Sequence, residues 1–334
     1  MPGADRAAPV APRRLRACAI LLGVLALVLP ASARTFRAAD NQAADYPTVQ
    51  ALMLMDRLVR ERSGGRHTIQ VFHSRQLGEE RDTIEQTRAG VIDINRVNAA
   101  PLRDVVPAVG VLSLPFLFRS EDHLHRVLEG RIGEEILGRF APERLVGLTF
   151  YDSGTRSIYN DVRPIATPAD LAGLRIRVQP SDLMSDLLRM SGALPVPLSY
   201  GQVLSALQTR LIDGAENNWT SYVTTGHFRR ARYITETNHT MPPEILLMSA
   251  KAWNELSVED QDMFRTAARE SSRFMRERWR EIERRSRAEA AASGIAVVTD
   301  VDRKAFEAAA RALEDRVVGD PAIRDLRDRI RDTP

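Results

Sequence analysis

A single stretch near the end of the chain sets the scale of the fold. Between Val258 and Ser293 the sequence has neither proline nor glycine and is rich in arginine, glutamate and alanine. Ser257 with Asp260 three residues later is typical of a helix start, and Gly294 is typical of a helix end. A continuous helix of these 36 residues is about 54 Å long, which exceeds the width of a compact domain. We therefore expect it to cross from one lobe of the protein to another.

The first 33 residues differ in character from the rest of the chain. Four arginines precede the apolar run ACAILLGVLALVL (17–29), which Pro30 and an A-x-A ending at Ala33 follow. This order is typical of a secretory signal peptide, and the apolar run is too short to span a bilayer. We expect cleavage after Ala33 and export. The only cysteine, Cys18, lies in this segment, so the exported chain has no disulfide and no thiolate chemistry.

Removal of the predicted signal peptide also changes the charge balance. It takes away four of the 47 basic and one of the 44 acidic residues, which leaves 43 of each. A nearly neutral chain argues against nucleic-acid binding, which requires a clustered basic face. Arginine is the general cation of this protein, because only Lys251 and Lys304 are lysines. An arginine therefore marks a site only when its position in the fold does.

Common catalytic and cofactor motifs are missing from the sequence, which contains no G-x-S-x-G, H-E-x-x-H, G-x-x-x-x-G-K or G-x-G-x-x-G. Carboxylate pairs such as Asp213 with Glu216 are candidates for acid and base roles, but turns and helix surfaces are full of such residues. His123 and His125 are two residues apart on a predicted helix, so they do not share a face. We expect both histidines to be solvated, and we expect no metal and no cofactor.

Short apolar runs alternate with amphipathic stretches along the mature chain. The predicted strands are 67–72, 91–97, 145–152 and 173–179, and a predicted helix covers 79–90. This alternation predicts an α/β architecture. The segments TRAGVIDINRVN (87–98) and TRLIDGAENN (209–218) are alike, since each has a helix end, a strand centred on Ile-Asp and then amides. The likeness indicates two lobes of related design, each sending one strand end to a shared cleft.

Arginines within strand-like segments are candidate binding residues. In LRIRVQ (174–179) the alternation places Arg175, Arg177 and Gln179 on the face opposite the apolar residues. A solvated outer face is one interpretation of this pattern. The other is a binding site, because Arg177 and Gln179 end the run just before Pro180, and a guanidinium there can hold a carboxylate through two parallel hydrogen bonds.

A cluster of polar residues follows another predicted strand, in LIDGAENNW (211–219). Asparagines at such a point are common turn formers. The alternative is a ligand site, since open α/β sheets place their ligands at the carboxyl ends of strands.

Six stretches in one order resemble the substrate-binding proteins of tripartite ATP-independent periplasmic (TRAP) transporters, the DctP-like family. They are QLGEERDTIEQTRAGVIDINRVN, VLSLPFLFRS, YDSGTRSIYN, LAGLRIRVQ, PVPLSYGQVLSALQTRLIDGAENNW and TNHTMPPEILLMS. The resemblance covers nearly the whole mature chain. It implies a two-lobed periplasmic binding-protein fold (type II-like) with a hinge and a long helix spanning both lobes. The expected lobes are 34–154 with 243–283, and 155–242 with 284–334.

The resemblance also implies the binding residues. On the side of the ligand carboxylate it places Arg177, which pairs with that group, together with Arg156, Asn217 and the aromatic wall residue Tyr200. The residues that match contacts to the rest of the ligand, from the other lobe, are Asn41, Glu80 and Asn98. Strand parity adds Arg96 and Gln179.

By this resemblance the protein is a monomeric periplasmic receptor, not an enzyme, that delivers a small organic acid to the small and large TRAP membrane subunits. The double amide before Trp219, together with INRVN, resembles the branch that takes sugar acids such as hexuronates and aldonates. Asn217 would donate to the carboxylate, and Asn218 and Trp219 would shape the adjoining wall. Thr220 departs from the proline common in that branch. The alternatives are a receptor for a C4-dicarboxylate or a 2-oxo acid, and a periplasmic enzyme that acts on sugar acids.

Overall fold

Two β-sheets form the framework of the protein. The computed structural model describes Gly3 and residues 33–334, so the predicted signal peptide with Cys18 lies outside the described residues except at Gly3 and Ala33. Within this part, strands and helices alternate, which confirms the predicted α/β class. None of the helices in residues 33–334 is both long and apolar enough to cross a membrane.

The first sheet has the strand order β2-β1-β3-β10-β4. Its strands are β1 (Arg34–Ala39), β2 (His67–Phe72), β3 (Ile94–Asn98), β4 (Leu145–Tyr151) and β10 (Glu244–Ser249). Strand β1 runs parallel to β2 and β3, whereas β10 is antiparallel to β3 and β4. Parallel neighbours need a crossover connection, which α1 (Pro47–Arg62) and α2 (Glu80–Arg88) supply.

The second sheet has the strand order β11-β9-β5-β8-β6-β7. Its strands are β5 (Arg156–Asn160), β6 (Arg175–Val178), β7 (Leu194–Pro197), β8 (Gly214–Asn217), β9 (Tyr233–Thr240) and β11 (Ala296–Val298). Strand β6 is parallel to β7 and β8, and β5 is antiparallel to β8 and β9. The crossovers are α6 (Asp182–Met190) and α7 (Val203–Gln208), so this sheet repeats the order of connections seen in the first.

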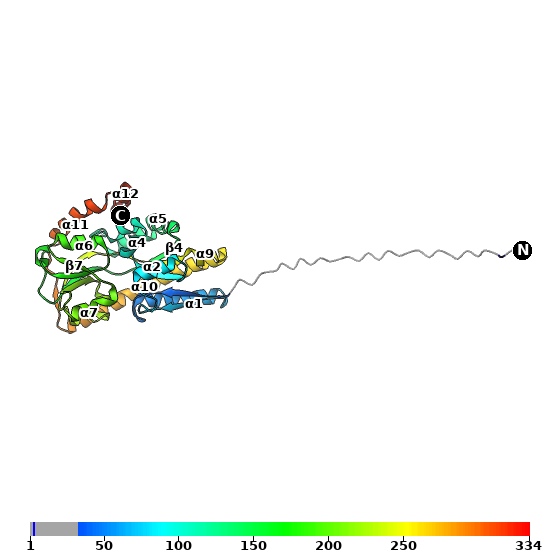
Figure 1. The fold of residues 1–334 in the computed structure, drawn as a ribbon, viewed down its shortest axis with the longest axis horizontal. Helices are drawn as coiled ribbons and strands as arrows, with labels where there is room; N and C mark the ends of the chain where they lie inside the picture. Colours follow the sequence, from blue (N-terminus) through cyan, green and yellow to red (C-terminus); the bar gives the residue numbers. More distant parts are fainter. Residues whose placement is uncertain (1–2, 4–32) are drawn as a thin grey trace. The chain divides into compact units, whose positions relative to one another are not determined.

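The remaining helices cover the sheets. They are α3 (Ala99–Leu102), α4 (Glu121–Glu129), α5 (Arg131–Gly138), α8 (Trp219–Thr224), α9 (Ala250–Asn254), α10 (Val258–Ala292), α11 (Arg303–Val317) and α12 (Pro321–Asp332). Helices α1 and α10 lie side by side (Figure 1). Leu52 and Met55 from α1 and Phe264 and Met275 from α10 are fully buried in one apolar cluster with Phe36 of β1. Burial of one apolar stripe on each helix holds both against the first sheet.

Helix α10 confirms the predicted long helix. It is 35 residues long, about 52 Å, and the Ser257 hydroxyl caps it by accepting from the Asp260 amide at 3.1 Å. Its earlier turns belong to the apolar cluster of the first sheet, whereas Ala290 packs in the cluster of the second sheet. The helix therefore spans both sheets.

The C-terminal helix α12 packs against the segment that precedes β4. The Nε2 atom of His123 lies 2.9 Å from the Ile330 carbonyl oxygen, and Arg329 pairs with Glu135 at 2.8 Å. The expectation that both histidines are solvated is wrong, because His123 is fully buried under α12 and His125 contacts Asp152 at 2.9 Å. All strands of each sheet fall within the segments expected for one lobe. Helix α12 belongs to the second expected lobe but contacts α5 of the first, so the lobe boundaries stay a prediction.

The two Ile-Asp segments occupy equivalent places in the two sheets. Asp93 exchanges a pair of hydrogen bonds with Arg37, whose amide donates to its carboxylate at 2.7 Å while its own amide donates to the Arg37 carbonyl. Asp213 makes the same pair with Arg175, at 2.8 Å for each bond. Both aspartates precede their strand, so the expectation that each strand centres on Ile-Asp is wrong. The aspartates instead fix the strand starts, so β3 and β8 begin directly after them.

Gly154 lies in the connection between β4 and β5, where the chain passes from one sheet to the other. Its φ of +64° is a left-handed conformation. A Cβ atom at this position would lie 2.7 Å from the Trp279 ring of α10, and that indole is buried. Close packing on the long helix and the positive φ both require glycine here.

We predict that Gly154→Ala lowers the free energy of unfolding by about 2–4 kcal/mol, measured by urea denaturation. The matched control is Gly173→Ala, because Gly173 has a similar φ of +76° and a Cβ atom added there would have no neighbour within 4 Å. The control isolates the backbone cost, about 1 kcal/mol. Equal losses in the two variants would mean that contact with Trp279 does not require glycine.

Candidate functional site

The candidate site is a buried cavity between residues of the two sheets. Seven of the nine predicted binding residues line it, namely Asn41, Glu80, Arg96, Arg156, Gln179, Tyr200 and Asn217. The other lining residues are Gln42, Asn218, Ser221 and Glu244. The volume of the cavity is about 20 Å³, which is room for about one water molecule, so a sugar acid enters only when the walls move apart. Every lining side chain can donate or accept a hydrogen bond, so the walls suit a polar ligand.

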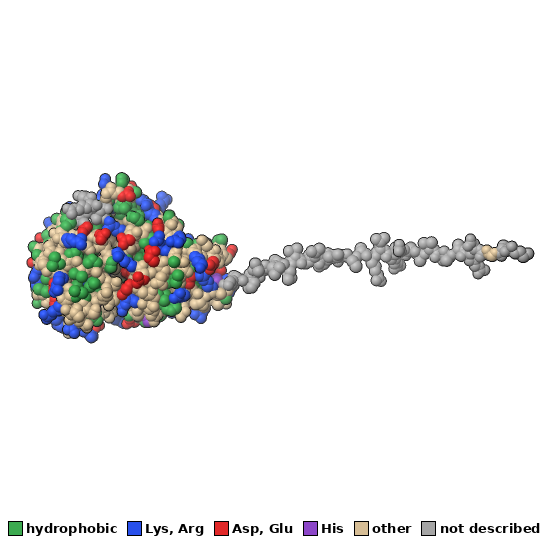
Figure 2. Space-filling model, in the orientation of Figure 1, with side chains coloured by type: hydrophobic (Ala, Val, Ile, Leu, Met, Phe, Trp, Pro, Cys, Tyr) green, Lys and Arg blue, Asp and Glu red, His purple; other side chains and the backbone are tan. Residues whose placement is uncertain are grey.

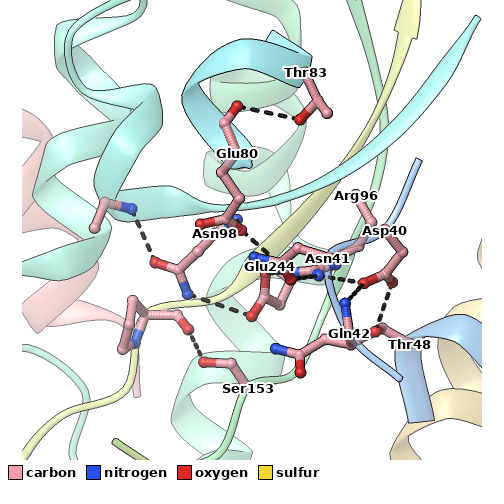
Figure 3. Close-up of polar contacts among 12 residues, drawn as sticks. Asp40, Asn41, Gln42, Thr48, Glu80, Thr83, Arg96, Asn98, Ser153 and Glu244 are labelled. Atoms are coloured by element: carbon pink, nitrogen blue, oxygen red, sulfur yellow. Dashed lines mark hydrogen bonds and ion pairs between the residues drawn. The ribbon is translucent and has the colours of Figure 1, made fainter. Parts of the chain in front are cut away.

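Arg96 organises the side of the cavity that belongs to the first sheet. Its guanidinium donates to Glu244 at 2.6 Å, to Glu80 at 3.3 Å, and also to Asp40 and Asn41 (Figure 3). Burial alone would lower the pKa of Arg96, but Asp40, Glu244 and Glu80 raise it well above its ordinary value. The arginine is therefore a fixed cation that three carboxylates surround.

Glu80 is the first residue of α2 and reaches toward β3. Its Oε1 atom accepts from the Asn98 amide at 3.0 Å, and the Asn98 side chain donates to Glu244 at 3.4 Å (Figure 3). Asn98, which does not itself line the cavity, thus connects two carboxylates that do. Burial raises the pKa of Glu80 to about 7, with Glu244 and Asp40 adding to the rise and Arg96 opposing it.

Arg156 and Glu216 form a buried pair on the side that belongs to the second sheet. Arg156 starts β5 and donates through Nη2 to Glu216 Oε1 at 2.9 Å, with a second bond from Nε to the other carboxylate oxygen. Burial would raise the pKa of Glu216, but Arg156 and His239 lower it to about 2. The charge of Arg156 is thus compensated within the protein.

Arg177 is held differently from the other two arginines. It is buried on β6, and its Nε and Nη2 atoms both donate to the Leu198 carbonyl oxygen, at 2.9 and 2.7 Å. Within residues 33–334 no carboxylate is in ion-pairing contact with it, and burial lowers its pKa. Arg177 is not among the lining residues, but its charge acts on Tyr200, which is. It is a buried cation next to the cavity without an ion-pairing carboxylate in the described chain, and only the more distant charges of Glu216 and Glu80 favour its ionised form.

The amides at the end of β8 have two separate tasks. Asn217 accepts from Arg156 Nη1 at 2.9 Å, which leaves its side-chain N–H groups for another partner. Asn218 caps α8 by accepting from the Ser221 amide at 2.6 Å, as Asn98 caps α3 through Ala100. The turn-forming interpretation is confirmed for Asn218, and the ligand-site interpretation stays a prediction for Asn217.

Trp219 differs from its expected place. Its indole N–H donates to Glu236 at 3.2 Å and its ring lies 4.7 Å from the Arg287 guanidinium, so it is absent from the cavity lining. The expectation that it shapes the wall is wrong, because the first turn of α8 points its side chain toward α10. The Tyr200 hydroxyl, by contrast, lies near Ser221 and Gln42 and has no hydrogen-bond partner among the described residues.

Sequence reasoning missed two carboxylates of the cavity network, Asp40 and Glu244, and considered Glu216 only as an acid or base beside Asp213. Asp213 and Glu216 are not a catalytic pair, since Asp213 binds Arg175 and Glu216 binds Arg156. The available signal for Asp40 and Glu216 was position, because both lie at or near a strand end. Among residues 33–334 no group of three His, Cys, Asp or Glu side chains is arranged to hold a metal ion.

We predict that Glu216→Gln lowers the free energy of unfolding by about 3 kcal/mol at pH 7, because Arg156 then stays buried without its anion. The control is Glu129→Gln, which removes an exposed ion pair and costs less than about 1 kcal/mol.

The effect of Glu216→Gln depends on pH, since the folded pKa of Glu216 lies below its ordinary 4.5. The stabilisation is fully present above pH 4.5 and is lost as the pH falls toward 2, so wild type and variant should converge there. Denaturation curves between pH 7 and 2.5 measure this. A difference that stays constant with pH would contradict the assigned ion pair.

Comparison with known proteins places the chain in a family. Residues 38–319 match the model of the bacterial extracellular solute-binding protein family 7, DctP. A TRAP periplasmic solute-binding protein of Bradyrhizobium sp., solved with D-galacturonate, is 45% identical with a TM-score of 0.88, over 90% of this chain and 100% of the other. Its counterpart from Xanthobacter autotrophicus, with bound β-D-galacturonate, is 42% identical with a TM-score of 0.87 over the same shares.

A third solved structure carries a different hexuronate. The TRAP periplasmic solute-binding protein of Chromohalobacter salexigens, with bound D-glucuronate, is 36% identical with a TM-score of 0.88, over 90% of this chain and 100% of the other. These likenesses confirm the expected two-lobed binding-protein fold and the resemblance drawn from the sequence. The chain belongs to the DctP family of periplasmic solute-binding proteins that serve TRAP transporters.

Proposed function

We propose that the protein is a periplasmic receptor for a sugar acid, most closely a hexuronate such as D-galacturonate or D-glucuronate. The observation that carries this proposal is Arg177, a buried guanidinium whose partner in the chain is a neutral carbonyl. The ligand carboxylate supplies the missing negative charge. The hydroxyl groups of the sugar bond to the amides and carboxylates at the other end of the cavity.

The held geometry of Arg177 suits a carboxylate. A guanidinium has five N–H donors in one plane, and the Leu198 carbonyl takes one on Nε and one on Nη2. Both hydrogens on Nη1 and the second on Nη2 remain, and one from each nitrogen forms the fork that two carboxylate oxygens match. Asn217 adds side-chain N–H groups from the neighbouring strand end, and the proposed roles of Arg156 and Gln179 are to orient this side of the site.

Binding energy must come from both sides of the cavity. Micromolar affinity corresponds to about 8 kcal/mol, whereas a hydrogen bond to a charged group contributes roughly 1.5–3 kcal/mol. Arg177 alone therefore does not hold the ligand. We assign the hydroxyl contacts to Asn41, Glu80, Asn98 and the Arg96 network, with Tyr200 as a further donor. Exclusion of water when the lobes close strengthens these contacts.

Contacts between residues of the two expected lobes stabilise the closed form. The Tyr46 hydroxyl lies 2.9 Å from the Ser221 hydroxyl, and the Gly201 amide donates to Glu79 at 3.1 Å. Ser221 lines the cavity and Gly201 adjoins the lining residue Tyr200, and a hinge between β4 and β5 would separate both contacts. We propose that the lobes are 34–154 with 243–283, and 155–242 with 284–334.

Export and partners follow from the same proposal. Residues 1–33 act as the signal peptide, and the mature monomer delivers its ligand to the small and large membrane subunits of a TRAP transporter without altering it. We propose no nucleic-acid partner, since such a partner requires clustered basic side chains. On the face that Figure 2 shows, acidic and basic side chains are intermixed.

We predict that Arg177→Lys weakens sugar-acid binding by about 2 kcal/mol, or roughly thirtyfold in Kd, because lysine cannot form the fork. Isothermal titration calorimetry with D-galacturonate and D-glucuronate measures this. The control is Arg175→Lys on the same strand, whose side chain is 42% exposed and pairs with Asp213. Unchanged affinity in Arg177→Lys would remove Arg177 from the site.

A thermal-shift screen tests the function as a whole, because a ligand that binds only the folded state raises the melting temperature. We expect D-galacturonate or D-glucuronate to give the largest shift, above succinate and pyruvate. Recovery of chemically intact sugar acid after incubation separates a receptor from an enzyme. A shift with succinate or pyruvate alone would replace the sugar acid by a C4-dicarboxylate or 2-oxo acid, and a converted product would show an enzyme.

A further inference from the structure

The two ends of the cavity differ in their balance of charge, and this difference bears on which acids can bind. We infer that the site accepts sugar acids with one carboxylate and rejects those with two, such as aldarates, because the end opposite Arg177 carries surplus negative charge. The inference rests on the proposed function and names the substrate class within it. It concerns discrimination between acids of similar size and hydroxyl content.

The end built on the first sheet has three carboxylates and one cation. Arg96 is the cation, and it donates to Asp40, Glu80 and Glu244 at once. All four side chains are buried or nearly so, with exposed fractions of 1% for Arg96, 0% for Asp40, 14% for Glu80 and 8% for Glu244. With all carboxylates ionised, this end has a surplus of two negative charges. Burial keeps solvent from screening that surplus.

The end built on the second sheet has the opposite balance. Arg156 and Glu216 cancel each other in a bidentate pair, and Arg177 is left as one uncompensated cation. Among the described residues that line the cavity, the end built on the first sheet has no spare guanidinium, because its one arginine, Arg96, already serves three carboxylates and Asn41. The protein therefore has a place for one ligand carboxylate and none for a second.

Hydroxyl groups fit where a second carboxylate does not. Glu80 and Glu244 are acceptors, and a sugar hydroxyl can donate to either of them. A carboxylate at the same place has no hydrogen to donate, would face two like charges, and would leave buried acceptors unpaired. Rejection through repulsion of this kind is a common way to obtain specificity.

The protonation state of Glu80 sets the size of the negative surplus at this end of the cavity. The charged groups that act on it are Arg96 from β3, Glu244 from β10, Asp40 after β1 and, across the cavity, Arg177 from β6, and the Asn98 amide donates to it. Burial and the two carboxylates raise its pKa to about 7. Above pH 7 the surplus is two charges, and below pH 7 protonation reduces it to one. Discrimination against diacids should therefore weaken as the pH falls, while sugar-acid carboxylates stay ionised.

Calorimetry at pH 8 with D-galacturonate and galactarate tests the inference directly. We expect galactarate to bind at least about a hundredfold more weakly than galacturonate. Equal affinities would overturn the inference and leave the proposed function intact. Binding of neither acid, or of galactarate alone, would overturn the inference. The proposed function falls as well if D-glucuronate also fails to bind.

The variant Glu80→Gln separates charge from shape, because the two acids also differ in ring form. Glutamine keeps an acceptor for the Asn98 amide and removes one negative charge. We expect the ratio of the two dissociation constants to fall about tenfold relative to wild type. Glu85→Gln is the control, since Glu85 lies on the same helix with a side chain that is 62% exposed, and its ratio should match wild type.

Wild-type protein gives the same test without a substitution. The ratio of dissociation constants should fall between pH 8 and pH 6 in wild type and stay constant in Glu80→Gln. The wild-type part of this measurement can be made even if the variant folds poorly. A wild-type ratio that does not change with pH, or an unchanged ratio in a folded Glu80→Gln protein, would overturn the assigned role of Glu80.

Discussion

The uncompensated charge of Arg177 is the constraint on which the site depends. A buried cation without an anion costs several kcal/mol, and the protein meets this cost for Arg96 and Arg156 with its own carboxylates. For Arg177 the hydrogen-bond acceptor within residues 33–334 is a carbonyl oxygen. Closure without ligand leaves this charge buried and unpaired, whereas closure around an acid neutralises it. Ligand binding and closure therefore favour one another, as expected when a ligand prefers one of two states.

The fold places these groups through one local design used twice. In each sheet an aspartate of an Ile-Asp pair binds the backbone of the neighbouring parallel strand. The strand that follows ends in an asparagine. Asn98 at the end of β3 caps a short helix itself, whereas Asn217 at the end of β8 is followed by Asn218, which caps the next one. The two strand ends carry Arg96 and Asn98 on one side and Glu216 and Asn217 on the other. The long helix α10 packs with both of the sheets that carry these ends, and the connection that contains Gly154 packs against it.

Local patterns predicted much of this. The long helix, the α/β class and most of the lining residues follow from helix signals, strand parity and family motifs, because these depend on nearby residues. The carboxylates Asp40, Glu216 and Glu244 did not emerge as partners, since their pairing with Arg96 and Arg156 joins residues 56–148 positions apart. The burial of His123 was missed for the same reason, because its partner lies on α12, 207 residues further along the chain.

A crystal structure of the protein with D-galacturonate tests the central claim most directly, because it locates the acid group among three buried arginines. We expect both carboxylate oxygens within hydrogen-bond distance of Arg177, with the Asn217 side chain as a further donor and the sugar hydroxyls against Glu80 and Glu244. A carboxylate bound instead to Arg96, or an Arg177 side chain turned to bulk solvent with the sugar acid elsewhere, would contradict the account.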